Sequence, residues 1–269
     1  MIFDNEYDEF LKKFRHFLMN SRYGLCNACN STTRFVSVDS WTVICTWNVC
    51  KRKESILSNT IISYRKKTLK FYFTIFKLMF QSIKLKDICT LLNCSYKSIS
   101  RKINNNVKEK YYDLIKPIGG PNLIVEIDES KFGKRKYNKG HRVEGVWVLG
   151  LVERSEKRKI IYIPLADRKK ETLIKIIRRF VLPGSTIYTD CWKGYLGLNE
   201  YFNHLTVNHS VSFVNENTGV HTNTIEGNWS LMKRNVPIRW RTKKKIFLPL
   251  FIAIQQRNGN LFEFITKIV

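Results

Sequence analysis

Three carboxylates have the chemical type and the positions that metal-assisted phosphodiester chemistry requires. Asp128 ends the apolar run Leu123–Ile127, and Asp190 ends the run Thr186–Thr189. Glu226 lies near the start of a predicted helix that begins at about Asn223. A fold that brings these acids together would present hard oxygen ligands to Mg²⁺, which can hold both the attacking and the leaving oxygen of a phosphodiester.

Each acid also has an ordinary structural explanation when it is taken alone. An aspartate after a strand is often a turn former or a helix cap. Glu226 three residues after Asn223 has the spacing of a capping box. The set is favoured because the ends of the first and fourth predicted strands would lie side by side if those strands pair. The helix after the fifth strand would then carry Glu226 to the same edge.

The elements that must position these acids follow from the hydrophobic pattern. Residues 3–18 and 66–104 have helical spacing, and the glycines and prolines of Pro117–Pro121 mark a boundary. Beyond it the pattern predicts a mixed α/β sheet in the order of an RNase H-like fold. The strands are expected at 123–127, 143–152, 159–165, 185–189 and 204–213, and the helices at 169–181, 193–202 and from 223 onward. We expect an N-terminal helix at 1–22, a ribbon at 23–55, a helical DNA-binding region at 56–116 and a catalytic domain at 120–269.

The charge of the chain points to a polyanionic partner. Lysine and arginine number 47 against 22 aspartates and glutamates, which gives a net charge of +25. An aromatic content of 13% indicates a folded protein rather than a basic tail, so nucleic acid is the leading partner, ahead of an anionic membrane surface. No run approaches the roughly 18 to 20 apolar residues of a membrane span. The first residues are acidic, unlike a secretory signal, and we expect an intracellular protein.

Four of the seven cysteines have the layout of a zinc ribbon. Two residues separate Cys26 from Cys29, four separate Cys45 from Cys50, and fifteen lie between the pairs. The second gap departs from the usual two residues, so unligated core cysteines are the alternative. Cys89, Cys94 and Cys191 have no ligand spacing and are predicted to be buried thiols.

Residues 85–103 have the pattern of a helix-turn-helix. Ile88, Leu91 and Leu92 would form the buried face of the first helix, residues 93–95 the turn, and Ile99 the anchor of the second helix. The alternative is an ordinary helical pair that packs against the core. In the first interpretation, the basic side chains available to a DNA groove and its phosphates are Lys97, Arg101 and Lys102.

A second basic cluster follows the first predicted catalytic strand. It comprises Lys134, Arg135, Lys136, Lys139 and Arg142, close after Asp128. A single cluster of this kind is normally a solvated face. If it binds DNA phosphates, that binding should weaken strongly with salt because counterions are released.

Five segments carry a family resemblance. They are Val125–Ser130 (VEIDES), Gly145–Arg154, Tyr188–Tyr195 (YTDCWKGY), Val207–Ser210 and His221–Arg234 (HTNTIEGNWSLMKR). In this order they resemble ISXO-type DDE transposases of bacterial insertion sequences and their eukaryotic Merlin-type relatives. The resemblance covers about residues 120–240.

The resemblance implies an RNase H-like catalytic core that uses two Mg²⁺ or Mn²⁺ ions. Asp128, Asp190 and Glu226 fall on the family's three metal-binding acids, and Lys233 on the lysine that follows them. His221 and His209 match motif histidines, for which contact with DNA and a structural role are both open, and Arg234 is expected to contact DNA. Water as the nucleophile gives nicking, and a terminal 3′-hydroxyl gives strand transfer. A structural zinc ribbon before the core is also typical of such proteins.

We therefore predict a DNA transposase that acts on transposon terminal repeats and target DNA. A homo-oligomeric synaptic complex is expected by analogy. The protein would work in the nucleus of a eukaryotic host, or in the cytoplasm beside the nucleoid of a bacterium. The alternatives are a catalytically silent, transposase-derived DNA-binding protein and an RNase H-like resolvase or ribonuclease, but the latter does not explain the ribbon and helix-turn-helix.

Overall fold

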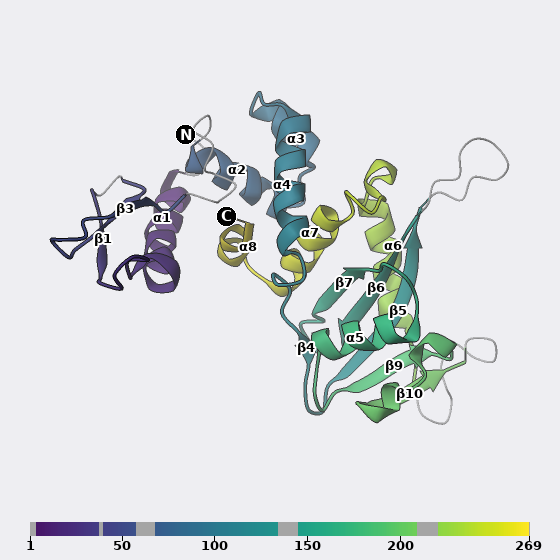
Figure 1. Ribbon diagram of the computed structural model, residues 1–269. Helices are drawn as coiled ribbons and strands as arrows, with labels where there is room; N and C mark the ends of the chain where they lie inside the picture. Colours follow the sequence, from purple (N-terminus) through teal and green to yellow (C-terminus); the bar gives the residue numbers. More distant parts are fainter. Residues whose placement is uncertain (1–3, 38–39, 58–67, 134–144, 209–219, 269) are drawn as a thin grey trace. The chain divides into compact units, whose positions relative to one another are not determined.

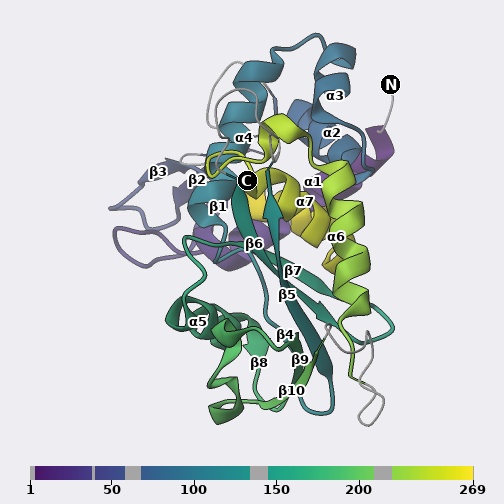
Figure 2. The same cartoon turned by 90° about the vertical axis from the view of Figure 1, so that its right-hand side faces the viewer.

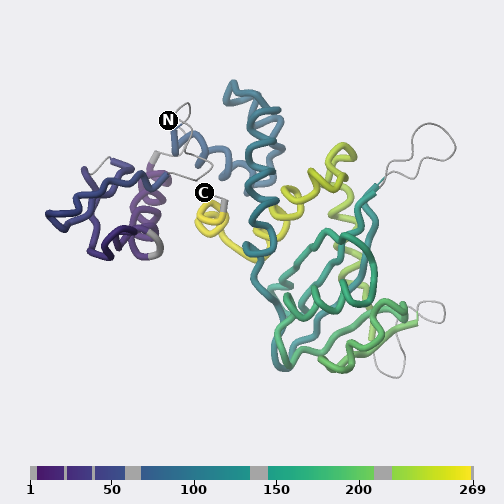
Figure 3. Tube along the Cα trace, in the orientation of Figure 1, coloured from purple at the N-terminus to yellow at the C-terminus, as the bar shows by residue number. Residues whose placement is uncertain are grey.

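The computed structural model describes residues 4–37, 40–57, 68–133, 145–208 and 220–268 (Figure 1), and Figure 3 draws the remaining residues in grey. The chain divides into two compact units. The first comprises Met1–Asn106 with Asn260–Val269, and the second comprises Val107–Gly259. Residues 260–269, which the sequence pattern groups with the catalytic domain, thus belong to the first unit.

The first unit begins with a helix and a small sheet. Helix α1 (Asp4–Leu18) buries Phe10, Phe14 and Leu18, which confirms the predicted amphipathic helix. A π-helical turn leads to an antiparallel sheet in which β2 (Thr42–Cys45) lies between β1 (Thr33–Phe35) and β3 (Lys53–Ser55).

Four more helices complete the first unit or lead out of it: α2 (Leu69–Phe80), α3 (Leu85–Leu91), α4 (Tyr96–Lys110) and α8 (Leu261–Ile268). The side chain of Thr68 caps α2 by accepting the Phe71 N–H. The buried Lys77 of α2 forms an ion pair with Glu6, which explains a cation within this apolar helix. No helix among the described residues is long and apolar enough to cross a membrane.

The second unit is built on a five-stranded mixed sheet in the order β10-β9-β5-β6-β7 (Figure 1). Strands β5 and β6 pair antiparallel, as do β6 and β7, whereas β9 runs parallel to both β5 and β10. The mixed α/β class predicted from the sequence is therefore confirmed. The bounds are Ile124–Phe132 for β5, Val146–Glu153 for β6, Ile160–Pro164 for β7, Thr186–Asp190 for β9 and Asn203–Val207 for β10.

Helices cover both sides of this sheet (Figure 2). Helix α6 (Asn223–Asn235) packs against β5 and β6, α7 (Phe247–Asn258) packs against β7, and α5 (Lys170–Phe180) lies on the side opposite α6. A Cβ on Gly150 of β6 would lie 2.5 Å from the Trp229 ring, so this glycine permits the close approach of α6. The short strands β4 (Ile118–Gly119) and β8 (Val181–Leu182) pair beside the main sheet.

Two predicted elements differ from the structure. Strand β5 continues to Phe132, so Asp128 lies inside a strand rather than at its end, because β6 continues the antiparallel pairing as far as Val146. The predicted helix at 193–202 is two 3₁₀ turns, Lys193–Tyr195 and Leu198–Glu200, separated at Gly197 with φ of 94°. Part of the predicted strand at 204–213 lies outside the described residues.

Candidate active site and metal sites

The register of the central strands places Asp128 and Asp190 at the same level. In the parallel pair β5–β9, Ile124 lies opposite Thr186, and Glu126 lies opposite Tyr188. Two residues further along each strand come Asp128 and Asp190. The pairing of β5 with β9 ends at Glu126, so Asp128 comes just beyond it, whereas Asp128 still pairs with Gly150 of β6. The predicted juxtaposition of the two strands is therefore found, although Asp128 is not a strand end.

Helix α6, which carries Glu226, packs against β5 and β6. Trp229, one helical turn after Glu226, packs on the sheet and donates from Nε1 to Oδ2 of Asp128 at 2.9 Å. The Thr222 hydroxyl donates to Oε1 of Glu226 at 3.1 Å, and Glu226 itself is exposed. On β9, Oδ1 of Asp190 accepts the Trp192 backbone N–H at 3.0 Å. Each acid thus has a donor that orients it.

The capping-box explanation of Glu226 is wrong. Helix α6 starts at Asn223, its N-cap is Thr222, and no side-chain cap bond is formed there. The N–H groups of Thr224 and Ile225 instead donate to Oε2 of the buried Glu126, both at 3.0 Å. Glu126 is a functional candidate that the sequence reading did not single out, because its partners lie 98 and 99 residues away.

The electrostatics around Asp128 favour a cation. Burial raises the pKa of Asp128, the Trp229 hydrogen bond opposes this shift, and the negative charges of Asp190 and Glu226 add to it. The three acids come from β5, β9 and α6. They do not, however, form a closed ligand set: among the described residues, the one such group of His, Cys, Asp or Glu with ligand atoms within 4.8 Å is a cysteine cluster.

On the other side of β5, Glu129 and Arg168 form a second group that the sequence did not indicate. Burial raises the pKa of Glu129 to about 7, against the opposing charge of Arg168, while the negative charge of Asp128 adds to the shift. Arg168 lies 3.5 Å from Glu129 and stacks 4.0 Å from the ring centroids of both Trp147 and Trp192. Arg168 is therefore packed between two aromatic rings and the Glu129 carboxylate.

The other predicted residues of this unit are placed as follows. Lys233 is half-buried on α6, two turns after Glu226, and Arg234 beside it is exposed. His221 is half-buried against Arg154, whose Nη2 lies 2.6 Å from His221 Nδ1. Lys134, Arg135, Lys136, Lys139, Arg142 and His209 lie outside the described residues.

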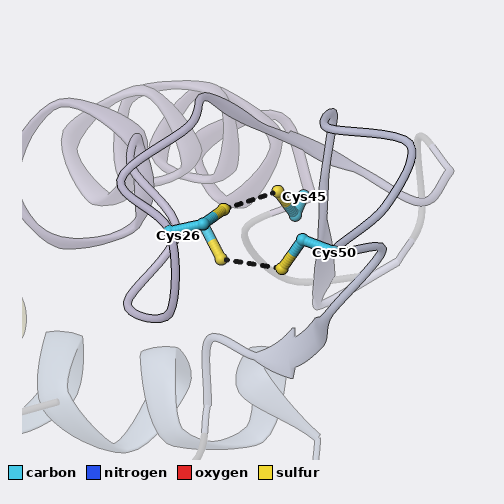
Figure 4. Close-up of side chains that lie close together, drawn as sticks. Cys26, Cys45 and Cys50 are labelled. Carbon is cyan, nitrogen blue, oxygen red and sulfur yellow. Dashed lines mark hydrogen bonds between the residues drawn. The ribbon is translucent and has the colours of Figure 1, made fainter.

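The four cysteines of the first unit converge, as the ribbon prediction requires. Cys26 Sγ lies 3.8 Å from Cys50 Sγ, and Cys29 Sγ lies 3.5 Å from Cys45 Sγ. Figure 4 shows the thiols of Cys26, Cys45 and Cys50 directed toward one another. All four sulfur atoms lie within 4.8 Å of one another. Sulfurs bound tetrahedrally at about 2.3 Å from one zinc ion stand about 3.8 Å apart, so this geometry fits zinc.

The predicted helix-turn-helix segment contains two helices joined by a short turn. Helices α3 and α4 flank residues 92–95, where Asn93 has φ of 44°. Ile88 and Ile99 are buried as predicted, but Leu91 is 73% exposed, because the inner face of α3 is formed by Ile88 and Cys89 instead.

The three basic side chains of α4 differ in their surroundings. Lys97 and Arg101 are exposed, as a DNA contact requires. Lys102 is half-buried, and its ammonium group donates to the Tyr72 hydroxyl at 3.0 Å. Burial lowers the pKa of Lys102.

Of the remaining cysteines, Cys89 is buried as predicted and Cys94 is partly buried. Cys191 is exposed, so its prediction as a buried thiol is wrong. It follows Asp190 directly, at the point where the chain leaves β9 for the 3₁₀ turn at Lys193–Tyr195.

Comparison with known families gives one match in the second unit. Residues 116–237 match a family model described as an ISXO2-like transposase domain, and this range includes the three acids, Lys233 and the whole five-stranded sheet. No curated protein matches the chain. The predicted resemblance to ISXO-type DDE transposases is thereby confirmed.

Proposed function

Residues 116–237 are an ISXO2-like transposase domain, and from that premise we propose that the protein cuts and joins DNA at transposon ends. The observation that carries the proposal is the register of β5 and β9, which brings Asp128 level with Asp190, together with the packing of α6, which carries Glu226, against β5 and β6.

The strand order supports an RNase H-like architecture for this domain. A central parallel pair is extended by two antiparallel strands on one side and by one parallel strand on the other. A helix between β7 and β9 and another after β10 complete the pattern. In this arrangement the first and fourth strands lie together in the centre of the sheet, so acids on both strands reach one reacting phosphate.

The donor set suits two Mg²⁺ or Mn²⁺ ions, since all three residues supply hard carboxylate oxygens. Such ions, when bound, stabilise charge on the attacking and leaving oxygens of the phosphodiester. The protein's own side chains orient the ligands: Trp229 holds Asp128, the Trp192 backbone holds Asp190, and Thr222 holds Glu226. Lys233 on the same helix would contact a DNA phosphate. Water as nucleophile gives a nick, and a 3′-hydroxyl gives strand transfer.

The first unit would recognise DNA and hold a structural zinc ion. Cys26, Cys29, Cys45 and Cys50 supply the thiolates, and the four-residue gap in the second pair is accommodated by the turn that follows β2. The exposed Lys97 and Arg101 of α4 would contact the terminal repeats. Joining two ends requires a homo-oligomeric synaptic complex, and the site of action would be the host nucleus or the bacterial nucleoid.

The test is a cleavage assay on labelled DNA taken from the ends that flank the coding region, with Mg²⁺ or Mn²⁺. We expect nicking and joining by the wild-type protein and loss of both in Glu226→Gln, with DNA binding retained. Glu156→Gln, which changes an exposed acid of the same unit, should keep full activity. DNA binding without any cleavage by the wild-type protein would instead favour the catalytically silent DNA-binding protein.

A further inference from the structure

Arg154, at the end of β6, contacts three separate chain segments within the second unit. Its Nε donates to Oε1 of Glu126 at 2.5 Å. Its Nη2 lies 2.6 Å from His221 Nδ1 and donates to the His221 carbonyl at 2.8 Å. Its guanidinium carbon lies 4.8 Å from the ring centroid of Tyr188. The Arg154 side chain is 22% exposed, so these contacts are largely shielded from water.

Each of these three segments delivers one acid of the candidate active site. Glu126 precedes Asp128 by two residues on β5, so both side chains lie on the same face of the strand. Tyr188 stands in the same relation to Asp190 on β9. His221 comes just before the first turn of α6, which carries Glu226.

Glu126 extends this connection through its second oxygen. The side chain of Glu126 is fully buried, and while Oε1 accepts from Arg154, Oε2 accepts the first-turn N–H groups of Thr224 and Ile225. A negative charge at a helix N-terminus is stabilised by the unpaired N–H groups and by the helix dipole. The carboxylate therefore fixes the start of α6 to β5 beside Asp128.

We propose that Glu126 and Arg154 are positioning residues that set the distances among Asp128, Asp190 and Glu226, and thereby the affinity of the acids for divalent metal. This inference rests on the proposed function. It assigns no contact with DNA or with the reacting atoms to either residue. Their effect is transmitted through β5, β9 and α6, to which the three acids belong.

Conservative substitutions should disturb this pair in a defined way. In Glu126→Gln one oxygen becomes an amide NH₂, which then faces either the Arg154 donor or the α6 N–H groups. A buried donor would be left without an acceptor in both orientations. Arg154→Lys keeps the positive charge but has no planar fork with which to reach Glu126 and His221 together.

The chain offers a matched control in Glu153. This carboxylate is also buried, but it accepts the Gly119 N–H at 2.9 Å and lies 3.7 Å from Lys159, and neither partner belongs to α6. Glu153→Gln thus removes a comparable buried charge without touching the connection to the three acids. Any general loss of stability on removing a buried carboxylate should appear in both variants.

The experiment measures Mn²⁺ binding to the full-length protein by calorimetry, and in parallel DNA nicking against Mn²⁺ concentration. We expect Glu126→Gln and Arg154→Lys to bind Mn²⁺ about 10- to 100-fold more weakly than the wild type, as changes of residues that orient metal ligands commonly do. Nicking should recover at raised Mn²⁺, and Glu153→Gln should bind Mn²⁺ as the wild type does. Thermal unfolding establishes that each variant is folded at the assay temperature.

Equal Mn²⁺ affinity in Glu126→Gln, Arg154→Lys and Glu153→Gln would overturn the inference, because burial alone would then explain the network. Failure of the proposed function has a different signature. In that case the wild-type protein does not nick its terminal DNA, while the loss of Mn²⁺ binding in Glu126→Gln still supports the positioning role.

Discussion

Asp128 carries its charge in a position where solvent is partly excluded and two other carboxylates act on it. Trp229 offsets part of this effect by donating to Oδ2, and the ring of Trp229 also packs against Phe132 and Tyr162. The same residue therefore orients the acid and fixes α6 to the sheet. A divalent cation would relieve the remaining repulsion, which is the physical reason for assigning metal binding to this group.

The raised pKa of Glu129, the residue after Asp128, should make the folding stability of the protein depend on pH. Its pKa is raised from 4.5 to about 7 by burial, so the folded state holds a proton that the unfolded state has lost. The contribution of the protonated Glu129 carboxyl group to the free energy of unfolding is complete below pH 4.5 and is lost as the pH rises through 7. The difference between the folded and unfolded pKa values is equivalent to about 3 kcal/mol of unfolding free energy. Glu129→Gln should remove this loss, so the variant should gain stability relative to the wild type between pH 4.5 and 8.

Denaturant unfolding of both proteins across this range, without added Mg²⁺, measures the effect. The glutamine keeps the volume of the side chain and an oxygen that can accept from Arg168. If the stability difference between the two proteins is the same at pH 4.5 and pH 8, then Glu129 does not hold a proton in the folded state.

At the scale of elements, α4 presents basic residues in two different environments, and this allows an internal control. Lys97→Ala and Arg101→Ala should each lower the slope of log affinity against log salt by about 1, because each removes a phosphate contact. Lys102→Ala should leave that slope unchanged and lower the melting temperature, since Lys102 donates to Tyr72. Salt titrations of binding to terminal DNA measure the slope. An equal change of slope in Lys102→Ala would exclude the assigned orientation of α4.

The small sheet of the first unit should depend on zinc. Cys45 lies in β2, and the other three cysteines lie in the turns around it, so a bound zinc ion would cross-link these short segments and its loss would loosen the sheet. Cys29→Ser should bind less than one zinc ion per chain and speed amide hydrogen exchange in β1–β3, while exchange in β5 stays slow. Metal analysis and hydrogen exchange by mass spectrometry measure both. Unchanged zinc content in Cys29→Ser would show that this cysteine is not a ligand.

Local patterns in the sequence predict the elements of the second unit well, because each strand is a short apolar run between polar turns. The expected order of strands in the sheet predicts that Asp128 and Asp190 lie near each other, and the sequence itself identifies no side-chain contact between them. The pattern misplaces the end of β5, since Asp128, Glu129 and Lys131 interrupt the apolar run while cross-strand pairing with β6 continues. Likewise, local hydrophobicity cannot reveal that Leu91 is exposed, because the side of α3 that is buried depends on the helices packed around it.

The partners of Glu126, Arg154 and Arg168 could not be predicted for a different reason. Arg154 and Glu126 are 28 residues apart, and Arg154 and His221 are 67 apart, so only the folded sheet brings them together. Glu126 and Arg154 both lie in segments that resemble the transposase family, but a resemblance between segments does not say which side chains are in contact. The capping of α6 by a strand carboxylate has no local signature at all.

At the scale of the whole molecule, a net charge of +25 accompanies the proposed centre of three acids. The positive charge favours association with DNA at a distance, and the acids would repel phosphate unless metal is bound. DNA binding and DNA cleavage should consequently respond separately to metal and to substitution. This separation distinguishes a metal-dependent nuclease centre from a basic protein with incidental acids.

The most direct measurement of that central claim is metal-specific rescue of Asp128→Cys in the terminal-DNA nicking assay. A thiolate is a poor ligand for Mg²⁺ and is accepted more readily by Mn²⁺, which is a softer ion. We predict no nicking by Asp128→Cys in Mg²⁺, clear nicking in Mn²⁺, and none by Asp128→Ala in either. Equal activity of Asp128→Cys and the wild type in Mg²⁺, or equal inactivity of the cysteine and alanine variants in Mn²⁺, would contradict metal binding by Asp128.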